Sequence, residues 1–497
     1  MQIKTVLPLL ALSLLALLSC NTEQPAIDGP YFGNGFRNGW ADEHSVVIWT
    51  RLTTIPDGRD SDHQFLEISR EESDSLGKMT DVAVLNRSQL PEGVSLEEIQ
   101  GACPGTDGQV KLRYYPENRE SDSRELDWTS VDPARNFTVQ WKLQDLAPGT
   151  SYQLEFLARK DAGSAVSDTF HGTFQTAGGA EMAGPLNFSI VSCHDYDRKD
   201  HPDGHKIYAA MLEDDLDFYI HTGDIEYYDK PNPYAFTEEL MRFKWDRLFA
   251  LPLQRDFYAR TTAYFMKDDH DILYDDAFPG MTYGPVTFER GLEIFDEEQF
   301  PSRDTTYTTI RWGKDLQIWI LEGRRYRSKN TDPDSPAKTI LGEAQKQWLF
   351  NTLQASDATF KVIVSASPVL GPDRPRGKND NHSNKAFQTE GDEIRAFVNQ
   401  FDNIFFCNGD RHWQYVTHFE DTNLWEFGCG AGADEHAGGW SQDNVQPEHR
   451  FLRVKGGYLF GQVTYENDQP QLHFQHRDVD GKTVHEEVFD SSGAPLQ

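Results

Sequence analysis

The sequence has few positive charges, few cysteines and, beyond its first twenty residues, no long hydrophobic run. Lysine and arginine number 47 against 80 aspartates and glutamates, which gives a formal net charge of −33. A surface of this sign repels nucleic acid and anionic lipid, so we expect no nucleic-acid binding. With 497 residues, the chain is long enough for two to four domains, each with its own core.

One short apolar run lies at the start of the chain. Residues 6–18 are apolar except for Pro8 and Ser13, and this run is too short to span a bilayer comfortably. It ends in Leu-Leu-Ser-Cys, which resembles the lipobox of bacterial lipoproteins. We therefore predict a signal peptide over 1–20 and lipidation of Cys20. The protein would be exported to the periplasm or cell surface and contact a membrane only through this anchor, in the outer membrane. An ordinary secretory signal is the alternative.

Four cysteines remain after Cys20, which is a small number for a protein of this length. An oxidising compartment permits disulfides, and Cys407 with Cys429 is one conceivable pair. The sequence alone does not establish the connectivity. Cys193 follows a buried strand, where we expect chemistry rather than a cross-link.

Residues 28–178 have the pattern of an all-β sandwich of the fibronectin or immunoglobulin type. Apolar residues alternate in five stretches bounded by turn formers, at 45–52, 64–70, 136–146, 151–160 and 168–176. Tyr152, shortly after Pro148-Gly149, predicts a tyrosine corner in which the hydroxyl folds back onto the backbone. Residues 177–185 are rich in Gly and Ala and predict a linker.

Residues 186–497 alternate short apolar strands with helical periods, which indicates an α/β domain. Polar residues collect at the carboxyl ends of these strands, where open α/β sheets bind their ligands. The last three strands, from residue 457 onwards, alternate again. We expect them to extend an edge of the sheet.

Four strand ends carry side chains that can bind a metal ion. They are Cys193-His194-Asp195, Gly223-Asp224 with Tyr227, Asp-Asp-His-Asp at 268–271, and Gly-Asp-Arg-His at 409–412. Carboxylates this close raise each other's pKa unless a cation is present. Any one of these motifs is usually a turn or a solvated loop, but four in succession predict a metal site.

The order of these motifs resembles the PhoD-type alkaline phosphatases, a branch of the binuclear metallophosphoesterases. Leu341-Gly342 with Gln345, Trp348 and Leu349 also matches, and the resemblance runs from about residue 30 to the end of the chain. It implies a metallophosphoesterase-like α/β sandwich domain over 186–497. It also implies that Fe³⁺ is held by Cys193, Asp224 and Tyr227, that Asp224 bridges to Ca²⁺ served by Asp269, and that Asp410 and His412 complete the ligands. Other divalent metals are possible.

The resemblance also implies roles around the metals. His270 would bind a phosphate oxygen or protonate the leaving alkoxide, or else orient Asp269. Arg324 and Arg327 match arginines that grip phosphate or an acidic metal ligand. Glu322 stands where the family has aspartate, so a ligand role there is in doubt. A solvated basic loop is the alternative reading of this stretch.

Three further residues are candidates for substrate binding. His194 stands where glutamine is usual and offers an extra ligand or substrate contact. Lys378 and His382 lie in the loop 371–382, which follows another strand and suggests a specificity loop; an ordinary surface loop is the alternative. An aromatic group could receive a sugar or an apolar leaving group, although most such residues simply pack: Tyr227, Tyr228, Tyr234, Trp413 and Tyr415.

We therefore predict an exported, metal-dependent enzyme that hydrolyses phosphate monoesters of small molecules or glycans. A phosphodiesterase, or a sulfatase acting on exported glycans, could use the same site. A non-catalytic glycan-binding lipoprotein with structural calcium is the alternative from another class. Thiol and imidazole groups among the carboxylates argue against it, because calcium prefers oxygen ligands.

Overall fold

The computed structural model describes residues 29–374 and 378–496. The predicted signal peptide and the lipidation of Cys20 lie outside these residues. Among the described helices, none combines the length and the hydrophobicity that crossing a bilayer requires. All four cysteines that the structure describes are free, so the disulfide considered between Cys407 and Cys429 is wrong.

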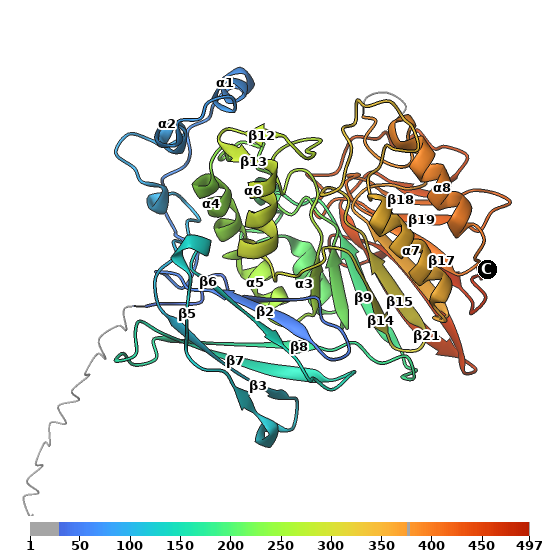
Figure 1. The fold of residues 1–497 in the computed structure, drawn as a ribbon, viewed down its shortest axis with the longest axis horizontal. Coiled ribbons are helices and arrows are strands. Elements are labelled where there is room, and N and C mark those ends of the chain that lie inside the picture. Colours follow the sequence, from blue (N-terminus) through green and yellow to red (C-terminus); the bar gives the residue numbers. More distant parts are fainter. Residues whose placement is uncertain (1–28, 375–377, 497) are drawn as a thin grey trace, which may run out of the picture.

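The amino-terminal part contains two antiparallel sheets (Figure 1). One has the order β1–β2–β6, at Phe36–Gly39, Val46–Arg51 and Thr138–Leu143. The other has the order β4–β3–β7–β8, at Arg124–Glu125, Gln109–Pro116, Ser151–Arg159 and Asp168–Gln175, with β5 (Thr129–Ser130) also paired to β3. Buried and partly exposed residues alternate along β3 and β7, and their inward side chains share one core with those of β2. The predicted tyrosine corner is present, since the Tyr152 hydroxyl accepts the Ala147 N–H at 2.9 Å.

The segment 58–104, between β2 and β3, departs from the prediction. The strand expected over 64–70 is absent, because Ser69 caps a helix instead: its Oγ accepts the Glu72 N–H at 3.2 Å. The helices here are α1 (Arg70–Leu76) and α2 (Val82–Arg87). Phe65, Leu85 and Ile99 of this segment are buried in a core shared with the α/β part.

The α/β part contains two sheets packed face to face, as the α/β sandwich implied by the family resemblance requires. The first has the order β11–β10–β9–β21–β22–β23, at Ala263–Phe265, Phe218–His221, Leu186–Val191, Gly457–Glu466, Gln469–Asp478 and Thr483–Phe489. The second has the order β14–β15–β16–β17–β19–β18–β20, at Thr308–Trp312, Leu316–Ile320, Phe360–Ser365, Ile404–Asn408, Trp425–Cys429, Gln414–His418 and His449–Arg453. The last three strands extend the first sheet, because β21 pairs antiparallel with β9. Apolar side chains of both sheets fill the space between them.

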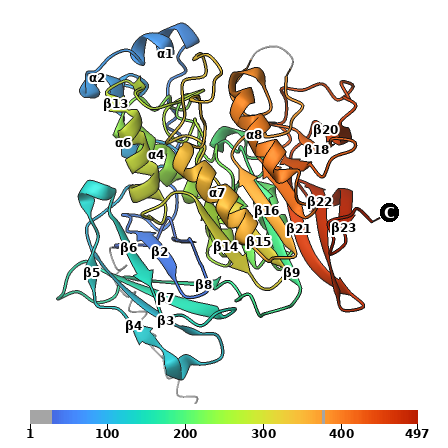
Figure 2. The ribbon, with the colours of Figure 1, turned by 45° about the vertical axis from the view of Figure 1, so that its right-hand side comes forward.

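Helices cover the two outer faces of this pair of sheets (Figures 1 and 2). One side carries α3 (Lys206–Leu212), α4 (Glu238–Phe249), α5 (Pro252–Tyr258) and α6 (Phe288–Glu293), with the short strands β12 (Thr282–Tyr283) and β13 (Val286–Thr287). The other side carries α7 (Glu343–Ala355) and α8 (Gln388–Val398). Helix, sheet, sheet and helix thus form four layers.

Buried polar contacts join the amino-terminal sheets to the α/β part. Arg51 forms an ion pair with Asp246 at 2.9 Å, and the Asn136 side-chain amide donates to the same carboxylate at 2.8 Å. Asn38 donates to the Thr261 carbonyl at 2.8 Å and accepts the Ala263 N–H at 2.9 Å. Since these groups are paired across the boundary, the two parts are fixed relative to each other at the start of β11.

Candidate metal centre at the strand ends

Four strands of the α/β part deliver the candidate ligands to one place. Residues 192–193 follow β9, 223–227 follow β10, 268–271 follow β11, and 409–412 follow β17. β9, β10 and β11 run parallel, so their carboxyl ends meet at one edge of the first sheet. The 409–412 loop reaches this edge from the second sheet. A Cβ at Gly409 would lie 2.1 Å from Thr222 Oγ1 and 2.2 Å from Ser192 Oγ, so only glycine fits there.

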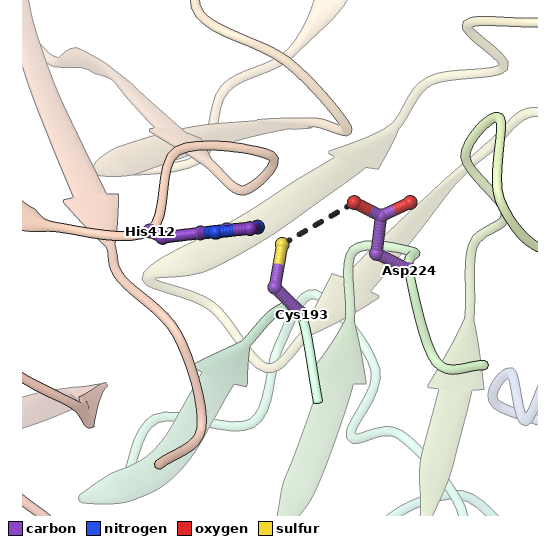
Figure 3. A group of neighbouring side chains, drawn as sticks. All are labelled: Cys193, Asp224 and His412. Carbon is purple, nitrogen blue, oxygen red and sulfur yellow. Dashed lines mark hydrogen bonds between the residues drawn. The ribbon is translucent and has the colours of Figure 1, made fainter. Parts of the chain in front are cut away.

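Three groups of side chains could each hold a metal ion, and Asp224 belongs to all of them. In each group the ligand atoms lie within 4.8 Å of one another: Cys193, Asp224 and His412; Asp224, Asp269 and His270; Asp224, Asp268 and Asp410. Figure 3 shows the first group, with the thiol and the imidazole approaching the carboxylate from separate loops. The predicted ligands thus converge, and Asp224 is the side chain that the three groups share.

Hydrogen bonds within the first group are loose. The Cys193 thiol donates to Asp224 Oδ2 at 3.4 Å, and the Tyr227 hydroxyl donates to the same oxygen at 3.3 Å. Tyr227 also lies 3.3 Å from His412 Nε2. Asp224 Oδ1 is buried and has no hydrogen-bond partner among the described residues. A buried carboxylate oxygen without a partner is costly, and a bound cation would remove that cost.

Backbone strain accompanies this arrangement. Cys193, Asp224 and Asp410 have φ values of 46°, 54° and 61°, in the left-handed region that non-glycine residues rarely adopt. The Asp271 carboxylate helps to hold the strained loop, because it accepts the N–H groups of Asp224 at 2.7 Å, Ile225 at 2.8 Å and Glu226 at 3.0 Å. Such strain persists only where the surroundings over-determine it, which is typical of functional sites.

The electrostatics of the cluster favour a cation. Burial raises the pKa of Asp224 well above its usual range, and the neighbouring Asp269 and Asp268 raise it further. Burial also raises the pKa of the Cys193 thiol and of the Tyr227 phenol. These groups become anionic ligands only when a cation stabilises their charge. Burial lowers the pKa of His412 to about 3, which keeps its imidazole in the neutral form that binds metal. The donor set therefore fits a pair of metal ions.

Arg324 contacts the acidic side of the cluster. Its Nε donates to Asp268 Oδ1, and its Nη2 lies 3.3 Å from Asp269 Oδ1. The sequence left two roles open for Arg324, binding phosphate or binding an acidic metal ligand. These contacts favour the second role. Asp268 was not among the ligands predicted individually, although it stands in the 268–271 motif. Its Oδ2 is buried and unpaired among the described residues.

His270 belongs to the cluster and is held by a carboxylate. Its Nδ1 is 2.6 Å from Asp229 Oδ1, and its ring centroid is 4.4 Å from that of Tyr227. Burial alone would lower the pKa of His270, but the Asp229 and Asp269 carboxylates raise it well above its usual range. A protonated imidazole at this position can donate a proton or bind an anionic oxygen.

Three predicted substrate-binding residues lie elsewhere. His194 is fully buried and its Nε2 lies 2.6 Å from the Tyr208 hydroxyl. Arg327 donates to Asn330 Oδ1 at 2.8 Å, and His382 lies 2.9 Å from Glu390 Oε2. Each of these three side chains is at most 3% exposed. Each side chain thus has a partner within the protein, and the substrate contacts expected for the three residues stay predictions.

Lys378 is placed differently. It pairs with Asp275, and the carboxylates of Asp269 and Asp410 help to raise its pKa even though burial lowers it. Its ammonium thus lies within the electrostatic reach of two predicted metal ligands, and its phosphate-binding role stays a prediction. Glu322 has no spare oxygen for a metal: Oε2 pairs with Lys267 at 2.6 Å and Oε1 accepts the Arg324 N–H at 2.8 Å.

The sequence analysis missed His436. Its ring lies 4.3 Å from that of His412 and 5.2 Å from that of Tyr227, and its Nδ1 is buried without a partner among the described residues. The sequence did offer a clue to His436. It lies in the Gly-rich stretch that follows β19, and so at the end of another strand of the second sheet.

Sequence comparisons identify relatives of this chain. Residues 292–480 match the PhoD-like phosphatase family. Alkaline phosphatase D of Bacillus subtilis (strain 168) is 23% identical over 348 residues, which cover 56% of this chain and 57% of the relative. The chain thus matches little more than half the length of that curated protein.

Structural comparisons extend over more of the chain. A solved structure of PhoD has a TM-score of 0.71 at 18% identity, and the match covers 94% of this chain and 92% of that one. A purple acid phosphatase from yellow lupin (Lupinus luteus) seeds has a TM-score of 0.59 at 11% identity, covering 92% of this chain and 74% of that one. The chain therefore shares its fold with PhoD and with this purple acid phosphatase, and the resemblance to the PhoD-type phosphatases is confirmed.

Proposed function

We propose that this relative of the PhoD-like phosphatases is a metal-dependent enzyme that hydrolyses phosphate monoesters. The observation that carries the proposal is the position of Asp224, which is shared by three potential metal-binding groups and keeps one buried oxygen unpaired. A buried carboxylate of this kind, with thiol, phenol and imidazole donors around it, suits a metal pair that works on phosphate.

The residues proposed to hold the metals form two sets that share Asp224: one has thiol, phenol and imidazole groups, and the other has carboxylates. Cys193, Tyr227 and His412 would hold Fe³⁺ with Asp224, while Asp269 and Asp410 would serve Ca²⁺ or another divalent ion from the other side of Asp224. Asp268, which the sequence did not single out, joins this second set. The metals, when bound, supply an activated water and neutralise charge that develops on phosphate.

The other side chains orient these ligands and handle protons. Arg324 fixes Asp268 and Asp269, so the acidic ligands keep their position when phosphate enters. His270, held by Asp229 through Nδ1, would protonate the leaving alkoxide, and the nearby carboxylates that raise its pKa favour this role. Lys378 would attract the phosphate dianion, which the net charge of −33 otherwise repels.

An activity panel tests the proposal. The purified protein is assayed with phosphate monoesters, phosphodiesters and sulfate esters, before and after removal of metals by chelator. We expect monoester hydrolysis that chelation abolishes and added metal restores. Preference for diesters or sulfate esters would assign the same site to one of the alternative substrates. Full activity in the metal-free protein would refute the proposal.

Metal analysis distinguishes the enzyme from a glycan-binding protein with structural calcium. Iron together with a tyrosinate absorption band, lost in Tyr227→Phe, supports the enzyme; calcium alone favours the binding protein.

Export and lipid anchoring through Cys20 are part of the proposal. Fractionation of cells that carry the wild type or Cys20→Ala tests them, since loss of the anchor should release the protein from the membrane fraction.

A further inference from the structure

A cavity of about 530 Å³ lies beside the metal centre, between the segment 58–104 and the β12–β13 hairpin. In Figure 1, α1 lies above β12 on this side of the molecule. Two carboxylates link the cavity to His270. Asp229 lines the cavity and lies 2.6 Å from His270 Nδ1, and Asp275 lines it and lies 3.8 Å from His270 Nε2. A group bound in this cavity would therefore lie close to His270.

The lining combines aromatic rings with hydrogen-bonding groups. Three tyrosines contribute, Tyr234, Tyr274 and Tyr283, and the last two have ring centroids 5.3 Å apart. Asp74, Asp229 and Asp275 supply carboxylates, while Ser73, Thr80 and Thr282 supply hydroxyls. Carboxylates accept hydrogen bonds from hydroxyl groups, and aromatic faces pack against the C–H faces of a ring. Among the lining residues only Arg70 and Lys78 are positively charged, against three carboxylates. A ligand part that is itself strongly anionic would therefore bind poorly in this cavity.

The cavity wall from segment 58–104 is fixed in place. The Gly284 N–H donates to the Gly77 carbonyl at 2.9 Å, which joins the end of α1 to the hairpin. Gln89, a buried residue, donates to the Tyr234 carbonyl and accepts the Tyr234 N–H, both at 2.9 Å. A Cβ at Gly77 would lie 3.1 Å from the Tyr283 ring, so the wall and the tyrosine are in close contact. A pre-formed site of this volume is in the range that binds small molecules.

We infer that this cavity binds the sugar part of a sugar phosphate, with the phosphate in the metal centre. The inference rests on the proposed function, and it narrows the leaving group to a polyhydroxylated ring. The cavity reaches the metal centre through Asp229 and Asp275, because both line the cavity and both contact His270, which belongs to one of the potential metal-binding groups. The segment 58–104 thereby contributes to substrate choice, although it lies far from the metal ligands in the sequence.

Kinetics with matched substrates and variants test the inference. Hexose 6-phosphates are compared with ethyl phosphate, which has neither a ring nor extra hydroxyls. We expect the wild type to prefer the hexose phosphates, and Asp74→Asn and Tyr274→Ala each to lower kcat/KM for them by about fivefold to tenfold, the size of one lost hydrogen bond or ring contact. Ethyl phosphate hydrolysis should be unchanged. Glu71→Gln, on the same helix but outside the cavity lining, is the matched control and should affect neither substrate.

The outcomes separate this inference from the proposed function. If the wild type hydrolyses esters without preferring hexose phosphates, or if Asp74→Asn lowers both substrates equally, the sugar site is refuted and the phosphatase stands. If no ester is hydrolysed, binding of free glucose, followed by ligand-observed NMR, decides about the cavity. Binding that is weakened in Asp74→Asn but not in Glu71→Gln supports the sugar site, and absence of binding overturns it.

Discussion

Two clusters of buried carboxylates lie close together in the α/β part, and their charge is balanced in different ways. In the first, Lys267 Nζ lies 2.6 Å from Glu322 and 2.9 Å from Asp296. In the second, the cluster around Asp224, Arg324 reaches Asp268 and Asp269, and one oxygen of Asp224 itself stays unpaired among the described residues. Arg324 connects the clusters, because its backbone N–H donates to Glu322 at 2.8 Å.

The pKa directions reflect this difference. Burial alone would raise the pKa of Glu322, but the Lys267 ammonium lowers it below its usual value. Burial raises the pKa of Asp224 well above its usual value, and its carboxylate neighbours add to the effect. The two carboxyl groups are similarly buried, so the difference lies in their neighbours: Lys267 outweighs the burial of Glu322, whereas His270 opposes but does not outweigh the burial of Asp224 and its carboxylate neighbours. The first cluster is built for stability, and the second is suited to an ion taken from outside.

The largest expected effect comes from Asp224→Asn. Because three potential metal-binding groups share this side chain, we expect loss of bound metal and a fall in phosphatase kcat by about a thousandfold or more. Metal analysis and steady-state kinetics measure both. Asp421→Asn, an exposed site, is the control. A metal-loaded, active Asp224→Asn protein would remove Asp224 from the site.

Lys267→Met tests the other cluster. Removing the ammonium leaves the buried Glu322 carboxylate without its cation, whereas Asp296 keeps Arg325 at 2.6 Å, so the free energy of unfolding should fall by about 3–5 kcal/mol. Denaturant unfolding measures the change. The double variant Lys267→Met/Glu322→Gln should recover part of this loss, because one uncompensated charge has been removed. If the double variant is no more stable than Lys267→Met, charge balance is not what this lysine provides.

Removal of the metals by chelator should lower Tm, and by more at pH 9 than at pH 6. The pKa of Asp224 is raised in the metal-free fold, so the proton that it binds at lower pH stabilises that fold and is lost as the pH rises through the raised pKa. Metal binding becomes stronger over the same range, because its ligands must be deprotonated. Thermal unfolding at both pH values, with and without chelator, measures the effect, a few kcal/mol in magnitude. If the chelator lowers Tm equally at both pH values, the Asp224 carboxylate does not lack a compensating cation in the metal-free protein.

The smallest effect concerns a third buried carboxylate, Glu390, which the protein satisfies with His382 and the Ile340 N–H, at 2.9 Å and 2.6 Å. Burial would raise its pKa, but these hydrogen bonds lower it from 4.5 to about 2. The stability that it contributes is therefore present above pH 4.5 and lost as the pH falls through about 2. Glu390→Gln should cost on the order of 2 kcal/mol at pH 7. Acid titration of unfolding checks that this cost vanishes near pH 2; a cost independent of pH would point to packing instead.

Local patterns were sufficient for most of the α/β part and for the ligand set. The alternation of apolar strands and helical periods over 186–497 predicted an α/β arrangement, and the four strand-end motifs contain the residues that the structure brings together. The 64–70 stretch failed because seven alternating residues do not establish a strand. Phe65 is buried, but Leu66 is 50% exposed and Ser69 caps a helix.

The sequence by itself determined which residue types follow each strand, and so the kind of chemistry that the meeting of these strand ends allows. Only the tertiary structure decided that the side chains of His194, Arg327 and His382 are buried in contacts within the protein. It also decided that Lys267 forms an ion pair with Glu322, and that segment 58–104 forms a wall of the cavity near His270. The physical reason is range. Strand and helix periods arise between neighbours along the chain, whereas the pairing of a buried charge depends on residues that folding brings from distant positions.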